Sequence, residues 1–362
     1  MKKCSVLISS LLITSATARG QTAWDARAAA AYLDARQTWW SGWPTAARDH
    51  QTACVSCHTA LPFALARPAL RGEVHESEPS SAERRMIDDV IKRVRLWREV
   101  EPFYPDQTRG LPKTSESRGT ESVLNALVLA TRDSHVGQPS DDARAAFENM
   151  WALQFRSGDL GGGWAWLNFH NEPWEANDSP YFGAALAAIA VGREPGEYAS
   201  TAENQERLKR LRDYLRKGMA TQPLLNRAML LWASAGIADL LLAEERQAIV
   251  DAVCAKQNAD GGWSLSSLGQ YKRSDNSPLD TLSDGYATGL VAYALQRAGL
   301  GATDARVSRA IAWLVEHQDR ATGTWTASSL NRQRDPKTDV GKFMSDAATA
   351  YAVLALTSAG KR

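Results

Sequence analysis

The sequence repeats a motif of glutamine, glycine and tryptophan: QNADGGW at residues 257–263 and QDRATGTW at residues 318–325. A longer copy runs from Gln154 to Trp164, and a degenerate copy, QTWWSGW, occupies residues 37–43. Each copy follows an amphipathic helical stretch and precedes a loop and then a helix, which is alanine-rich after the three clearer copies. Self-similarity at this spacing predicts a repeat protein built from helical hairpins.

The residue types of the motif explain how such hairpins join. A glutamine at the end of an outer helix can bond the free amides and carbonyls of neighbouring helix ends. Glycine permits a tight reversal of the chain, and tryptophan fills the gap between adjacent repeats. The helices rich in small residues can then crowd together around a common axis.

Applied along the chain, this rule predicts six pairs of outer and inner helices. The pairs lie near 24–36 with 56–68, 82–99 with 118–131, 140–154 with 178–192, 203–217 with 222–239, 242–257 with 283–299, and 305–317 with 344–358. The fourth pair lacks the motif and rests on its apolar periodicity alone. Six hairpins are enough to close a ring, so the fold class is all-α, an (α/α)6 toroid; an open helical solenoid is the alternative.

At this point the chain resembles the squalene/hopene cyclase and prenyltransferase superfamily of α/α toroids, whose repeats match these motifs. The resemblance covers most of the chain, most clearly residues 140–360. It implies the fold. The cyclases protonate their substrate with a D-x-D-D motif that is absent here, since the nearest acidic cluster, Asp280 to Asp284, does not match it. The zinc ligands of the prenyltransferases are not matched either, so we do not expect either activity.

The N-terminus and the composition indicate an exported protein. Lys2 and Lys3 precede a short apolar run, and Ala16-Thr17-Ala18 is typical of a cleavage site, so residues 1–18 are interpreted as a signal peptide. We expect periplasmic or secreted localisation and no transmembrane segment in the mature chain. A formal net charge of +1 gives no reason to expect a nucleic-acid partner. Residues 19–132 are predicted to form N-terminal hairpins that pack with the toroid of residues 133–362 as one barrel.

A C-x-x-C-H sequence, Cys54 to His58, is the pattern of covalent haem c attachment. Cys54 and Cys57 would form the thioethers, and His58 would be the proximal iron ligand. A redox C-x-x-C, a zinc half-site and a disulfide are the alternatives. The distal ligand is open among four residues, namely Met86, His75, His170 and Met344, or the sixth position is vacant.

Acidic residues occupy the position in other repeats that His58 occupies in the first. Each lies at the predicted start of an inner helix, so the four would surround the same end of the toroid as a haem bound to His58. The residues are Glu121, Asp178, Asp284 and Asp346. Their simpler role is to cap the helices and complement the helix dipoles.

Three functions are consistent with this sequence. The first is an exported c-type haem protein that transfers electrons to a redox partner protein, with one covalent haem. The second is a haem-dependent oxidoreductase acting on a small apolar, isoprenoid-like molecule in the toroid cavity. The third is a non-redox toroid enzyme, or a module that binds a terpenoid or a polysaccharide, in which C-x-x-C-H is incidental. The first is our main prediction.

Overall fold

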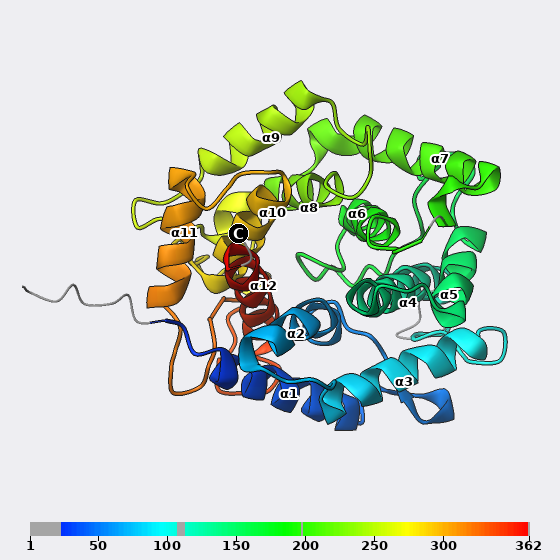
Figure 1. The fold of residues 1–362 in the computed structure, drawn as a ribbon, viewed down its shortest axis with the longest axis horizontal. Coiled ribbons are helices and arrows are strands. Elements are labelled where there is room, and N and C mark those ends of the chain that lie inside the picture. Colours follow the sequence, from blue (N-terminus) through cyan, green and yellow to red (C-terminus); the bar gives the residue numbers. More distant parts are fainter. Residues whose placement is uncertain (1–22, 107–112, 197, 361–362) are drawn as a thin grey trace, which may run out of the picture.

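The computed structural model describes residues 23–106, 113–196 and 198–360, and within them twelve α-helices form a closed ring of hairpins (Figure 1). Outer and inner helices alternate along the chain. The predicted all-α toroid is confirmed. The predicted signal peptide, residues 1–18, lies outside the described residues, and the predicted division of the chain at residue 132 stays a prediction.

Six helices form the outer layer and six form the inner layer. The outer helices are α1 (Ala26–Gly42), α3 (Ser81–Arg95), α5 (Asp141–Ala152), α7 (Ala202–Gly218), α9 (Ala243–Cys254) and α11 (Ala305–Glu316). The inner helices are α2 (Ala60–Val74), α4 (Thr114–Val136), α6 (Ser179–Val191), α8 (Leu224–Ala233), α10 (Gly285–Arg297) and α12 (Phe343–Ala359).

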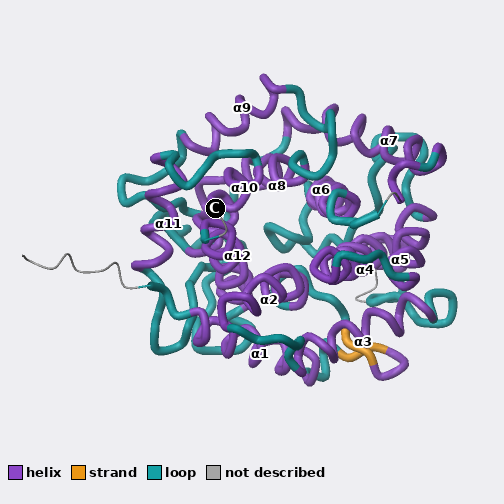
Figure 2. The backbone as a smooth tube through the Cα atoms, in the orientation of Figure 1, coloured by secondary structure: helices purple, strands orange, loops and turns teal. Residues whose placement is uncertain are grey.

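Short elements fill the connections between these helices. A small antiparallel hairpin of β1 (Ala47–Arg48) and β2 (Thr52–Ala53) lies beside α3 (Figure 2). The 3-10 helices are η1 (Asp49–Gln51), η3 (Tyr198–Ser200), η4 (Met219–Thr221) and η5 (Leu265–Leu268).

The boundaries of α2 and α4 differ most from the prediction. Helix α2 begins four residues late, because the Ser56 hydroxyl accepts the amides of Thr59 (3.2 Å) and Ala60 (3.0 Å) and so holds the preceding turn outside the helix. It then continues through Pro68 to Val74. Helix α4 extends beyond both predicted ends, to 23 residues.

The glutamine of each clear motif joins two outer helices, as predicted. Gln257 Nε2 donates to the carbonyl of Gly261 in its own motif (2.8 Å) and to that of Arg306 in the next outer helix, α11 (2.9 Å). Gln154 makes the same pair of bonds, to Gly162 and to Arg207 of α7. The glutamine therefore attaches the end of one outer helix to the beginning of the next.

The tryptophan of each clear motif is fully buried and forms a hydrogen bond with the outer helix that precedes it in the chain. The indole N–H groups of Trp164, Trp263 and Trp325 donate to carbonyls in the last turn of the preceding outer helix, at 2.6–2.8 Å. Each ring thus fills the space between repeats and satisfies a helix-end carbonyl.

The ring closes between the last motif and the first helix. Gln318 accepts the amide of Asp25 (2.6 Å) and donates to its carbonyl (2.9 Å), and Asp25 is the N-cap of α1. Gly323 has a φ of +78°, and a Cβ there would overlap the backbone of Ala28. Only glycine fits this contact between the sixth repeat and the first.

The inner helices approach one another closely because their facing residues are small. Helix α12 packs against α2 on one side and α10 on the other. A Cβ on Gly289 of α10 would overlap the backbone of Ala352 in α12. Within the described residues, no helix is both long and apolar enough to cross a membrane.

We expect Gln318→Ala to lower the free energy of unfolding by about 2–4 kcal/mol. The change removes three hydrogen bonds at the junction of the last motif with the N-cap of α1, namely two to the backbone of Asp25 and one to the carbonyl of Gly323. Chemical denaturation measures the effect. The control is Gln247→Ala, which removes an exposed hydrogen bond to Asp251 and should cost less than about 0.5 kcal/mol. Equal effects of the two substitutions would show that ring closure does not depend on Gln318.

Candidate functional site

Long loops before the inner helices meet at one end of the ring, which we call the mouth. The loops that precede α6 and α12 are joined by two hydrogen bonds, one in each direction, between Glu172 and Asn331 (both 2.7 Å). The carbonyl of Asn331 accepts the amide of Ser274, which lies in the loop before α10 (2.8 Å). Residues from three repeats therefore come together at the mouth.

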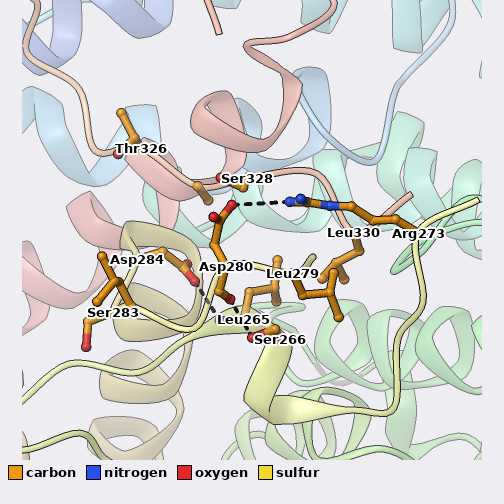
Figure 3. Close-up of a pocket in the computed structure, with 12 residues that line it drawn as sticks. Leu265, Ser266, Arg273, Leu279, Asp280, Ser283, Asp284, Thr326, Ser328 and Leu330 are labelled. Atoms are coloured by element: carbon orange, nitrogen blue, oxygen red, sulfur yellow. Dashed lines mark hydrogen bonds and ion pairs between the residues drawn. The ribbon is translucent and has the colours of Figure 1, made fainter. Parts of the chain in front are cut away.

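A pocket of about 220 Å³, which we call the acid pocket, opens between the loops before α10 and α12 (Figure 3). Leucine side chains form part of its wall. Its polar lining consists of Ser266, Arg273, Asp280, Ser283, Asp284, Thr326 and Ser328. Two carboxyl groups thus share a pocket that is otherwise rich in hydroxyls.

Asp284 is the N-cap of α10, which agrees with the helix-capping role predicted for it from the sequence. Its carboxyl accepts the amides of Ala287 (2.9 Å) and Leu265 (2.5 Å), and these bonds hold it in one orientation. Burial raises the pKa of Asp284 to about 7, against the opposing effect of these amides. Near neutral pH this carboxyl can therefore carry a proton and give it up.

Asp280 has the opposite electrostatic environment. A hydrogen bond from Ser328 and the guanidinium of Arg273 lower the pKa of Asp280, which is largely exposed. The Arg273 side chain is buried and also donates to the carbonyls of Ser329 and Pro278, so its position is fixed. One carboxylate is therefore ionised beside a carboxyl that is half protonated near pH 7, which is the arrangement of an acid and base pair.

A second pocket, of about 290 Å³, adjoins the first. Arg273, Asp280, Ala327 and Ser328 line both, so the two form a continuous groove; we call the second the arginine pocket. It contains Arg334, whose pKa is lowered by burial and by neighbouring Arg332. Within the described ranges, no carboxylate lies within 4 Å of Arg334. The groove thus has carboxyls at one end and an arginine without a carboxylate at the other.

Another carboxyl pair lies at the mouth without lining either pocket. Burial, and then the charge of Asp178, raise the pKa of Glu172 to about 7. Burial also raises the pKa of Asp178, whose carboxyl accepts a hydrogen bond from Asn226 (3.3 Å) and does not cap α6. Burial, and then the charges of both carboxyls, raise the pKa of Tyr271, and among the described residues its buried hydroxyl has no hydrogen-bond partner.

The other two predicted mouth acids hold helices together. Asp346 accepts hydrogen bonds from Tyr32 and Arg36 of α1 and from Thr59, each at 2.7 Å. Glu121 is buried within α4 and pairs with Arg93 of α3 (2.6 Å). Burial raises the pKa of both carboxyls, and the arginines oppose that rise. Their carboxyls are engaged in the wall of the ring.

The C-x-x-C-H segment packs into the core. Cys54 and Cys57 are free thiols with 6% exposure each. Burial raises the pKa of the Cys54 thiol to about 11 and that of Cys57 well above its usual value, so neither is poised to react as a thiolate.

His58 lies in an aromatic cluster formed by side chains from α1, α12 and the loop before α6. Its imidazole stacks on Phe343 (ring centroids 3.7 Å apart), meets Trp40 edge-on (4.9 Å), and lies 5.9 Å from Trp174. Nδ1 is hydrogen-bonded to Thr59 (2.8 Å). Burial lowers the pKa of His58 to about 3, and the residue lines neither the acid pocket nor the arginine pocket.

The four predicted distal ligands are scattered. His75 caps the C-terminus of α2, a helix length of about 22 Å from its N-terminus next to His58. His170 is exposed in a loop, and Met86 is buried in the outer helix α3. Met344 is buried beside Phe343 in the first turn of α12.

Four residues of the mouth were not predicted from the sequence, namely Arg273, Glu172, Tyr271 and Arg334. Asp280 was considered only as part of an acidic cluster that does not match a cyclase motif. A signal was present for Asp280, because Asp280 and Asp284 flank the start of an inner helix after a complete motif. No local pattern marks the others, whose neighbours come from different repeats.

Comparison of the sequence with protein-family models and with curated proteins finds no match. Among solved structures, the chain is similar to the unsaturated glucuronyl hydrolase of Bacillus sp. GL1, described as responsible for the degradation of glycosaminoglycan. The TM-score is 0.52 at 11% identity, over 92% of this chain and 95% of that chain. The chain has the α/α-toroid fold.

Two further similar structures are a glycosidase, with a TM-score of 0.49 at 13% identity over 91% of this chain and 97% of that one, and a polysaccharide lyase. The lyase matches at a TM-score of 0.36 and 12% identity over 94% and 90%.

The prediction of a haem c electron-transfer protein is wrong. The one similar structure named above with a TM-score above 0.5 is described as a hydrolase responsible for the degradation of glycosaminoglycan. In this chain Cys54 and Cys57 are packed into the core, and the half-buried His58 is stacked on Phe343 and contacts Trp40, an arrangement that does not fit a covalently attached porphyrin. Within the described ranges, no group of three or more histidine, cysteine and acidic residues lies together as a metal site.

We expect both thiols of this segment to be free and protected. In a Cys4→Ser, Cys254→Ser background, a disulfide-exchange reagent such as Ellman's should find no reactive thiol in the folded protein. In guanidinium chloride it should find both Cys54 and Cys57, because a raised pKa and burial, not a covalent bond, block the reaction. Failure of either thiol to react after unfolding would contradict this assignment.

We expect the partly buried Asp284 carboxyl to make the free energy of unfolding depend on pH. Between about pH 4 and 7 the folded protein retains a proton that the unfolded chain releases, so this contribution to stability falls as pH rises. The asparagine introduced by Asp284→Asn does not titrate. The stability of Asp284→Asn relative to the native protein should therefore rise with pH in that window, by up to about 1.4 kcal/mol per unit.

The matched control is Asp304→Asn, at the N-cap of α11. Hydrogen bonds and the charge of Arg306 lower the pKa of Asp304 to about 2, so its relative stability should not change between pH 4 and 7. Urea denaturation at several pH values measures both. If the free energy of unfolding relative to the native protein changed with pH in the same way for both variants, the pKa of Asp284 would not be raised.

Proposed function

We propose that the chain is a non-redox enzyme that hydrolyses a glycosidic bond in the groove at the mouth of the toroid. One observation carries the proposal. Asp284, with a pKa of about 7, and Asp280, with a lowered pKa, line one pocket of a solvent-accessible groove. Glycoside hydrolysis needs two carboxyl groups in different protonation states.

In the proposed reaction Asp284 is the general acid. Its proton passes to the glycosidic oxygen as the bond from that oxygen to the anomeric carbon breaks. The Asp280 carboxylate takes a proton from the water whose oxygen bonds to the anomeric carbon. The amides of Ala287 and Leu265 hold Asp284 in place, and Arg273 holds Asp280, so both groups are oriented before substrate arrives.

We propose that the substrate is an acidic oligosaccharide. The arginine pocket continues the groove away from the carboxyls, and Arg334 there has no carboxylate partner among the described residues. A guanidinium binds a carboxylate or sulfate through two parallel hydrogen bonds, whereas a neutral sugar would leave its charge uncompensated. The hydroxyls of Ser266, Ser283 and Thr326 supply donors and acceptors for sugar hydroxyls. The glucuronyl hydrolase similar in fold is described as acting in glycosaminoglycan degradation, which is compatible with this substrate class.

Three further predictions from the sequence are kept as proposals. Residues 1–18 would direct export to the periplasm or out of the cell. The QW-like motifs would reflect kinship with the squalene/hopene cyclase superfamily. A small apolar molecule would fit best in the pocket between α2 and α3, where Ala64, Met86 and Ile87 form much of the wall.

The test is hydrolysis of uronic-acid and neutral oligosaccharides by the purified protein. We expect cleavage of the acidic substrates, with kcat/KM falling above about pH 7 as Asp284 loses its proton. The acid limb, where Asp280 gains a proton, should lie below the usual range of an aspartate because its pKa is lowered. Asp284→Asn and Asp280→Asn should each lower kcat at least about 100-fold. Arg334→Gln should raise KM for acidic substrates and change kcat little.

The control variant is Glu172→Gln, at the mouth but outside the groove. It should change kcat less than about tenfold. If Glu172→Gln lost activity and Asp280→Asn kept it, the reaction would be assigned to the other carboxyl pair, Glu172 and Asp178. An unsaturated sugar product would indicate elimination instead of hydrolysis. No cleavage of either class would overturn the proposal.

A further inference from the structure

A further pocket, which we call the rear pocket, lies at the end of the ring opposite the mouth. It has a volume of about 270 Å³ and lies among the C-terminal ends of α4, α6, α8 and α10. Its polar lining residues are Arg193, Arg297, Tyr293 and Ser134. Since α10 has 13 residues, about 20 Å of helix separates this pocket from Asp284. The rear pocket is therefore distinct from the proposed reaction groove.

Arg193 has weak partners within the protein. Its guanidinium donates to the hydroxyls of Thr131 and Tyr293 at 3.5 and 3.4 Å, the long limit for a hydrogen bond. Its central carbon lies 5.6 Å from the ring of Trp232, which holds the guanidinium over an aromatic face. Most of its five N–H donors are thus available to the pocket.

Neither arginine has a carboxylate to neutralise it. Among residues 23–106, 113–196 and 198–360, no Asp or Glu oxygen lies within 4 Å of Arg193 or Arg297. Burial lowers the pKa of Arg193, and the positive charge of Arg297 lowers it further. Two like charges therefore face one partly buried space, an arrangement that a bound anion would relieve.

The negative ends of the helix dipoles explain only part of this arrangement. Arg297 is in the last turn of α10, and Arg193 follows α6, so each is favoured by the nearby helix carbonyls. Arg132, near the end of α4, has both the helix carbonyls and a carboxylate to compensate its charge, because it pairs with Asp133 at 2.6 Å. Arg193 and Arg297 lack such a partner, although they lie at the same end of the ring.

The backbone beside the arginines leaves the pocket open. Gly192 and Gly236 both line it, and a Cβ on Gly192 would lie 2.7 Å from the Cα of Gly236. The ends of α6 and α8 therefore meet through two glycines without side chains that would fill the space. Trp232 and Tyr293, edge to face at 4.9 Å, form a rigid wall opposite.

We propose that the rear pocket binds a small molecule through an oxyanion group, a carboxylate, sulfate or phosphate. The guanidinium of Arg193 supplies a planar pair of donors, Arg297 a second positive charge at the rim, and Tyr293 and Ser134 hydroxyl donors. This site does not depend on the proposed hydrolase activity, because it uses none of the residues of the groove.

The experiment is calorimetric titration of the folded protein with phosphate, sulfate and acetate, each against chloride at constant ionic strength. We expect saturable binding of at least one of them. Saturation by phosphate or sulfate indicates a tetrahedral ligand group, and saturation by acetate alone indicates a carboxylate. Arg193→Gln and Arg297→Gln should each weaken that binding at least about tenfold.

The matched control is Arg98→Gln, which removes the same charge from an exposed position remote from the pocket and should leave the affinity unchanged within about twofold. Arg297 is exposed, so Arg297→Gln should fold. If Arg193→Gln does not fold, the affinity of Arg297→Gln decides the result. Absence of saturable binding to the native protein, or equal weakening by Arg98→Gln, would overturn the proposal.

Discussion

The toroid depends on a glutamine side chain that holds the backbones of two successive outer helices. Gln154, Gln257 and Gln318 each bond a glycine carbonyl in their own repeat and a carbonyl at or near the start of the following outer helix. At Gln318 the following helix is α1, so the same contact that propagates the repeat also closes the ring. The inner helices depend on this closure, because small side chains pack well only when both neighbours are in place.

Acidic residues in the first half of three inner helices, or at the N-cap, have different partners and different chemistry. Glu121 and Asp346 have arginine partners from outer helices, and each pair joins an outer helix to an inner helix. Asp284 is the N-cap of α10 and has no arginine partner among the described residues, so burial dominates and raises its pKa. A change of partner, not of the acid itself, separates a structural carboxylate from a carboxyl that can exchange protons at neutral pH.

The C-x-x-C-H segment shows why a short motif can mislead. The five residues from Cys54 to His58 have the right identities and spacing for haem attachment, but attachment also requires space around them. Helix α12, almost 300 residues later, brings Phe343 against His58, and the loop before α6 adds Trp174. Local sequence contains no information about these contacts, since they arise only when the ring closes.

The sequence by itself determined the helices, their pairing and the ring, because each motif acts on its own repeat and on the next. All six predicted pairs occur, including α7 with α8, where apolar periodicity sufficed without a motif. The tertiary structure alone decided which carboxyls are paired, which arginines lack a carboxylate, and that Asp280, Asp284 and Arg334 share a groove. The pKa of a side chain depends on burial and on charges brought near it from distant repeats, and neither quantity can be read from the residues adjacent in sequence.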